Sequence, residues 1–167
     1  MASDQEISSL KIIDSHVHGF PNRLFEKIWD YFEKNYWPIY HRYYFEESIQ
    51  FLRDHKVYFH SLLNYAHKPE ISHELNLWTR TMKEKYNQLI PFGSIHPDDS
   101  YLEAELERLL NPKKYDFAGL KFQLMVTDFD PNYPKMHPIY EYLSKFDKIL
   151  VIHAGSGPNI DFVLNKD

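Results

Sequence analysis

The sequence lacks cysteine, basic runs and long apolar stretches. Without cysteine among its 167 residues, the chain has no disulfides, zinc–thiolate sites or cysteine nucleophiles. Any bound metal must therefore be held by histidine nitrogens and carboxylate oxygens. The net charge is −5 and no Lys/Arg run occurs, so nucleic acid is not expected as a partner. The longest purely aliphatic run, residues 149–152, is too short to cross a bilayer.

Residues 1–10 are polar and acidic and lack the apolar segment of a signal peptide. Together with the missing cysteine, this predicts a cytoplasmic protein. No low-complexity segment or Gly/Ser linker interrupts the chain, so we expect one partial domain over residues 1–167.

Short apolar runs alternate with amphipathic stretches along the whole chain. The pattern predicts strands near residues 10–16, 57–63, 89–95, 117–122 and 148–153. It predicts helices over residues 20–36, 46–55, 69–86, 97–110 and 138–146.

This alternation is typical of a parallel sheet with right-handed crossovers, either an open doubly wound sheet or a (β/α) barrel. The turn after the first strand, residues 14–19 (DSHVHG), has no Gly-rich phosphate loop, which favours the barrel. A complete (β/α)8 TIM barrel needs about 250 residues. The chain therefore predicts an α/β fold truncated to about the first five β/α units.

His16 and His18 follow the first predicted strand and, two residues apart, are expected on one face of it with Asp14. Two neighbouring imidazoles can take two positions around a divalent cation. His153 ends the fifth predicted strand, and the C-termini of barrel strands converge at one rim. We therefore predict His16, His18 and His153 as metal ligands, with His153 also in a catalytic role.

Lys121 and Gln123 share one face of the fourth predicted strand. A lysine that faces a barrel interior needs a partner, because an unpaired buried charge is unfavourable. Lys121, a catalytic candidate, could bind a substrate anion, pair with a carboxylate, become carboxylated, or reach solvent at the rim. Gln123, His60 and His96 are candidates for substrate binding. For His96, the N-cap-like residues that follow it favour a structural role instead.

Three of these segments together resemble the amidohydrolase superfamily. The resemblance is strongest to the amidohydrolase-related branch, which includes aminocarboxymuconate-semialdehyde decarboxylase and lactone hydrolases. The segments are His16-Val17-His18, Gly119-Leu120-Lys121 and Ile152-His153-Ala154-Gly155.

The resemblance implies a (β/α)8 barrel in which His16, His18 and His153 hold one divalent ion, with zinc expected. Lys121 matches the strand-four lysine that is carboxylated in some binuclear members. Gln123 stands where many members have histidine, which argues against a second metal. The superfamily's strand-six histidine and strand-eight aspartate have no counterpart, so we expect a homo-oligomer or a companion C-terminal half.

The resemblance implies a metal-dependent hydrolase that cleaves an amide, lactone or ester bond of a small molecule through a metal-activated water. A metal-dependent decarboxylase of the same branch is the alternative. A catalytically inactive half-barrel subunit is a third possibility. A phosphoesterase of the polymerase-and-histidinol-phosphatase type fits less well, because no further histidine follows His18 before His41.

Overall fold

The computed structural model describes residues 11–127 and 129–153 of the chain. Its five strands run parallel and pair in sequence order from β1 to β5. They are β1 (Ile12–Asp14), β2 (Val57–Leu62), β3 (Leu89–Gly93), β4 (Gly119–Phe122) and β5 (Ile149–Ile152). The predicted parallel sheet is confirmed.

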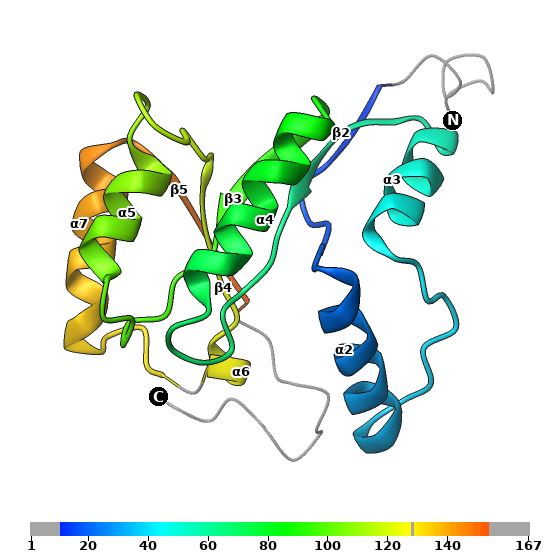
Figure 1. Ribbon diagram of the computed structural model, residues 1–167, viewed down its shortest axis with the longest axis horizontal. Coiled ribbons are helices and arrows are strands. Elements are labelled where there is room, and N and C mark those ends of the chain that lie inside the picture. The colour runs from blue at the N-terminus through cyan, green and yellow to red at the C-terminus, as the bar shows by residue number, and fades with distance from the viewer. Residues whose placement is uncertain (1–10, 128, 154–167) are drawn as a thin grey trace, which may run out of the picture.

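Helices connect each strand to the next. α2 (Asn22–Asn35) and α3 (Phe45–Asp54) link β1 to β2, α4 (Ser72–Lys85) links β2 to β3, and α5 (Leu102–Leu110) links β3 to β4. The link from β4 to β5 contains α6 (Leu124–Thr127), the 3-10 helix η1 (Pro134–Met136) and α7 (His137–Lys145). In Figure 1, α2 and α3 lie towards the β1–β2 end of the sheet, and α5 and α7 lie towards the other end.

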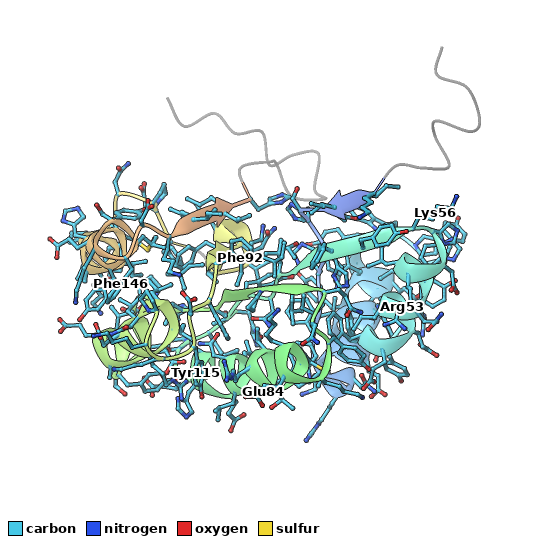
Figure 2. All side chains as sticks on the ribbon, turned by 90° about the horizontal axis from the view of Figure 1, so that it is seen from above. Arg53, Lys56, Glu84, Phe92, Tyr115 and Phe146 are labelled. Carbon is cyan, nitrogen blue, oxygen red and sulfur yellow. The ribbon has the colours of Figure 1, made fainter. Side chains whose placement is uncertain are left out.

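The sheet is curled into a half-barrel. Seen from above, α3, α4, α5 and α7 form an outer arc around the strands, and β1 and β5 lie at the open side (Figure 2). Glu84 and Tyr115 lie on the outer side of this arc, whereas Phe92 of β3 lies within it. A doubly wound sheet would carry helices on both faces. The structure therefore confirms the predicted truncated barrel.

The main hydrophobic core lies between β4 and the helices α5 and α7. Its buried members include Leu106, Leu109, Phe117, Leu120 and Ile139. A smaller cluster joins α3 to β2 and β3 through the buried side chains of Phe45, Ile49, Leu62 and Leu89. The middle of the sheet is consequently well covered on its helix side.

Gly119 allows β4 and β5 to approach closely. A Cβ atom at this position would lie 1.8 Å from the carbonyl oxygen of Ile149, the residue that pairs with it. No side chain fits there without moving the strand, so the sequence needs glycine at the start of β4.

Several predicted boundaries differ from those observed. β1 is shorter than predicted and ends before the two histidines. α5 begins at Leu102 instead of residue 97, because the carboxylate of Asp99 accepts hydrogen bonds from the backbone N–H groups of His96 and Glu70 and from the hydroxyl of Ser72. These bonds hold the preceding turn in a non-helical path. α6 and η1 were not predicted. None of the helices in the part of the chain that the structure describes is long and apolar enough to span a membrane.

Candidate metal centre

His16 and His18 lie in an extended segment that β2 holds in place. The hydroxyl of Ser61 accepts a hydrogen bond from the backbone N–H of Val17 at 3.0 Å. The Leu63 N–H donates to the Val17 carbonyl, and the Gly19 N–H donates to the Leu63 carbonyl, both at 2.9 Å. The segment therefore continues the direction of β1 beyond the regular strand.

The two imidazoles face each other through their Nε2 atoms, which are 3.2 Å apart. Two nitrogens bound to one tetrahedral zinc at 2.0–2.1 Å would be about 3.3 Å apart. The Asp14 carboxylate accepts a hydrogen bond from the His16 N–H at 2.9 Å, so it stabilises the turn between the strand and the pair. The spacing of the histidine pair therefore fits two ligands of one divalent ion.

Aromatic rings form one wall beside His18. Its ring stacks on Phe20, with ring centroids 6.2 Å apart, and meets Tyr65 edge-on at 5.8 Å. Burial raises the pKa of the Tyr65 hydroxyl. Sequence reasoning missed Tyr65, although it follows the end of β2 as His16 and His18 follow the end of β1. The same strand-end argument would have identified it.

The pKa of each imidazole of the pair is lowered, which favours the neutral form. Burial lowers the pKa of His18 to about 4, and the positive charge of Lys121 contributes next. The same two causes, in the same order, lower the pKa of His16. Because a metal binds the neutral imidazole, protons would compete little for these nitrogens near neutral pH.

Lys121 lies on β4, between Leu120 and Phe122, which belong to the core on the helix side of the sheet. Its side chain is fully buried, and its ammonium has no hydrogen-bond or ion-pair partner among the described residues. Burial lowers its pKa. Two residues further on, the side-chain carbonyl oxygen of Gln123 is also buried without a partner among those residues. Two buried polar groups without partners among the described residues thus come from the segment at the end of β4.

His153 follows β5, and its backbone N–H donates to the Phe122 carbonyl at 3.1 Å. Repulsion from His153 is among the smaller causes that lower the pKa of His16 and of His18. Within residues 11–127 and 129–153, no three His, Asp or Glu side chains are yet arranged to hold an ion together. His153 as a third ligand therefore stays a prediction.

His60 lies on the helix side of β2, away from the pair. Its ring meets Phe45 of α3 edge-on, and its Nδ1 is 3.1 Å from the Ser61 carbonyl. It lines a cavity of about 390 Å³ together with Ile49 and Arg53. The structure does not bring His60 to the histidine pair, because alternate residues of a strand point to opposite faces.

His96 belongs to the turn that precedes α5. Its Nδ1 accepts a hydrogen bond from the backbone N–H of Asp98 at 3.1 Å, and its own backbone N–H donates to Asp99. Its ring meets Phe129 edge-on at 5.9 Å. These contacts are those of a residue that stabilises the turn, and none of them joins His96 to the histidine pair.

By sequence, no family model and no curated protein matches the chain. By structure, it matches 5-carboxyvanillate decarboxylase from Novosphingobium aromaticivorans in complex with manganese, at a TM-score of 0.66 and 14% identity. The match covers 87% of this chain and 51% of that one. The chain therefore shares the fold of the corresponding half of that structure.

Two further structures support this likeness. An amidohydrolase II structure has a TM-score of 0.63 and 15% identity, with 89% of this chain and 52% of that chain covered. For 2,6-dihydroxybenzoate decarboxylase from Rhizobium the TM-score is 0.57 and the identity 17%, with 87% and 49% covered. The chain therefore spans about half the length of the solved structures that it matches.

Proposed function

We propose that the chain provides the metal-binding half of a metal-dependent hydrolase of the amidohydrolase type. His16, His18 and His153 would hold one divalent ion. The observation that carries this proposal is the pair of neutral imidazoles whose Nε2 atoms face each other at 3.2 Å. The substrate would be a small molecule with an amide, lactone or ester bond.

When bound, such an ion lowers the pKa of water towards about 7 and polarises a carbonyl group. Residues of the chain would control the protonation of the histidines and the access of water to them. Lys121 contributes to keeping both imidazoles of the pair neutral and thus free to bind metal. Phe20 and Tyr65 limit the access of water to His18 from one side. Zinc suits imidazole ligands. Manganese is an equal candidate, because one structural neighbour contains it.

A metal-dependent decarboxylase is the second candidate. Two of the structural neighbours are decarboxylases of aromatic acids, and they resemble this chain about as closely as the amidohydrolase II structure does. Assays of the metal-loaded protein with both lactone or amide substrates and carboxylated aromatic substrates would distinguish the two activities.

The active assembly would include a partner for the open side of the sheet. β1 and β5 pair on one side only in the described structure, and Ile12, Ile13 and Ile149 are exposed there. Unpaired edges with apolar side chains favour association. A companion half with further β/α units, or a second copy of this chain, would cover them. A protein that is monomeric over a wide concentration range in size-exclusion chromatography would contradict this part of the proposal.

Metal content tests the function. We expect the purified, metal-equilibrated protein to hold about one divalent ion per chain, measured by elemental mass spectrometry. The variants His16→Ala and His18→Ala should each lose most of it, whereas His137→Ala, which changes an exposed histidine of α7, should not. Unchanged metal content in the His16→Ala/His18→Ala double variant would refute the ligand assignment. Metal binding without either activity would favour an inactive half-barrel subunit.

A further inference from the structure

A cavity lies at the opposite end of β2 from the histidine pair. Residues of α3, of the start of β2 and of the segment before β3 line it, and its volume is about 390 Å³. The pair, in contrast, is held by Ser61 and Leu63 near the end of β2. Pockets for small molecules have volumes of about 300–1,000 Å³. The cavity is therefore large enough for a ligand of its own.

The charged side chains that line this cavity are basic. Arg53 and Lys56 both line it, and they lie at the same end of the molecule in Figure 2. No Asp or Glu is among the described residues of the lining. Arg53 has no ion-pair partner in the described part of the chain, unlike Arg80 and Arg108, which each pair with a glutamate. An anion would therefore meet positive charge here without competition from a carboxylate of the lining.

His60 brings a hydrogen-bond acceptor to the same cavity. Its Nδ1 lies 3.1 Å from the Ser61 carbonyl oxygen, and because a carbonyl can only accept, Nδ1 carries the proton. Burial lowers the pKa of His60 and thus favours the neutral ring, in which Nε2 has a free lone pair. This Nε2 is buried and has no hydrogen-bond partner among the described residues. A complementary ligand would therefore carry a hydrogen-bond donor as well as a negative charge.

We propose that this cavity binds a small phosphate monoester that carries a hydroxyl group. The phosphate accepts hydrogen bonds from Arg53 and lies near the charge of Lys56, and the hydroxyl donates to Nε2 of His60. A guanidinium matches the geometry of phosphate oxygens. A phosphate monoester carries a charge of about −1.5 to −2 at pH 7, so it balances two basic side chains better than a carboxylate does.

Four probes separate the groups that the ligand needs. They are glycerol 3-phosphate, propyl phosphate without a hydroxyl, glycerol without a charge, and glycerate with a carboxylate. Binding would be measured by NMR titration of the full chain, kept metal-free so that phosphate cannot bind to an ion at the histidine pair. We expect glycerol 3-phosphate to bind most tightly. Charge-assisted hydrogen bonds are about twice as strong as neutral ones, so Arg53→Gln should weaken its binding about tenfold or more.

The matched control is Arg23→Gln, which changes an exposed arginine of α2 that does not line the cavity. It should leave the binding of glycerol 3-phosphate unchanged, and circular dichroism would verify that each variant is folded. Absence of binding, wild-type affinity in Arg53→Gln, or equal affinity for glycerol would each overturn the proposal. Tighter binding of glycerate would overturn the assignment to phosphate.

His60→Phe tests the contact with the hydroxyl, because it keeps a ring and removes the acceptor. The variant should lose the preference for glycerol 3-phosphate over propyl phosphate. The wild-type titration gives the same information if this variant does not fold, since the ring resonances of His60 should shift more with glycerol 3-phosphate. Equal affinity of the wild type for the two phosphates would refute the contact.

The cavity and the metal centre can be tested separately. The His16→Ala/His18→Ala double variant should bind glycerol 3-phosphate as the wild type does, because the cavity lies at the other end of β2. A loss of binding in that variant would place the phosphate at the histidine pair and contradict the proposal.

Discussion

The inner strand β4 and the two edge strands of the sheet differ in how completely they are packed. All four residues of β4 are buried, and Leu120 lies in the main core. On the flanks, Ile13 of β1 is 63% exposed and Ile149 of β5 is 57% exposed. The inner strand β4 is therefore covered on both faces and paired on both sides within this chain, whereas the outer strands β1 and β5 each have an unpaired side.

The candidate site is divided between these two regions. Lys121 comes from the inner strand β4, where it alternates with the core residues Leu120 and Phe122. His16, His18 and His153 come from the flanks, where an edge of the sheet is open. The pair on the β1 side is nonetheless well ordered by Ser61 and Leu63, but no three-ligand group is complete among the described residues. We therefore expect a complete metal centre to require closure of the sheet.

Gly119→Ala, at the start of the inner strand β4, should have the greatest effect on stability. The added Cβ would meet the Ile149 carbonyl at 1.8 Å, and a backbone atom cannot yield as a side chain can. We expect the free energy of unfolding to fall by about 3 kcal/mol or more, measured by urea denaturation. Gly93→Ala is the control, because its Cβ would meet only side chains, at 2.8 Å from Leu109. Equal losses from both substitutions would contradict the packing described for β4 and β5.

The second prediction is that the free energy of unfolding depends on pH through His18, which follows β1. The pKa of His18 is about 4 in the folded chain against 6.5 for an ordinary imidazole, so the unfolded chain binds more protons between these values. The free energy of unfolding should therefore fall by about 3 kcal/mol as the pH drops from 6.5 to 4. Urea denaturation across this range would measure it. His18→Asn should reduce this dependence, and an unchanged pH profile in that variant would refute the buried, neutral state of His18.

Lys121→Met should stabilise the fold. It replaces a buried ammonium that has no partner in the described residues by an apolar side chain of similar length. We expect a gain of about 2 kcal/mol in the free energy of unfolding, whereas Lys113→Met should stay within about 0.5 kcal/mol of wild type. A loss of stability in Lys121→Met would mean that the lysine already has a counter-charge within the protein.

The smallest effect is expected at the β5 edge. Ile149→Ser removes an exposed apolar side chain, so the isolated chain should change in stability by only about 0.5 kcal/mol. Analytical ultracentrifugation should instead detect weaker association of the variant. A large loss of stability in a monomeric sample would show that β5 is packed as tightly as β4.

Much of the fold was predictable from the sequence, because apolar periodicity reports which segments must be buried. All five strands occur where apolar runs were found, and α2 lies within one residue or two of the predicted helix 20–36. The turn before α5 was wrongly predicted as helix. Its structure depends on hydrogen bonds from Glu70 and Ser72 to the Asp99 carboxylate. Contacts between segments distant in sequence leave no periodic signal.

The site was predictable to a similar degree. The strand-end positions of His16, His18 and Lys121 predict a shared rim; in the structure the two histidine rings meet and the charge of Lys121 acts on both, while their roles stay predictions. His60 was predicted for the site, although its place on β2 puts it on the helix side with Phe45. Strand parity could not be assigned from the sequence alone for β2, because both of its faces carry apolar and polar residues.

Anomalous diffraction from crystals grown with manganese would show whether the three histidines bind one divalent ion. We expect one anomalous peak, bound by the Nε2 atoms of His16 and His18 and by the ring of His153. A metal peak elsewhere, or an intact histidine pair with no peak at saturating manganese, would contradict it.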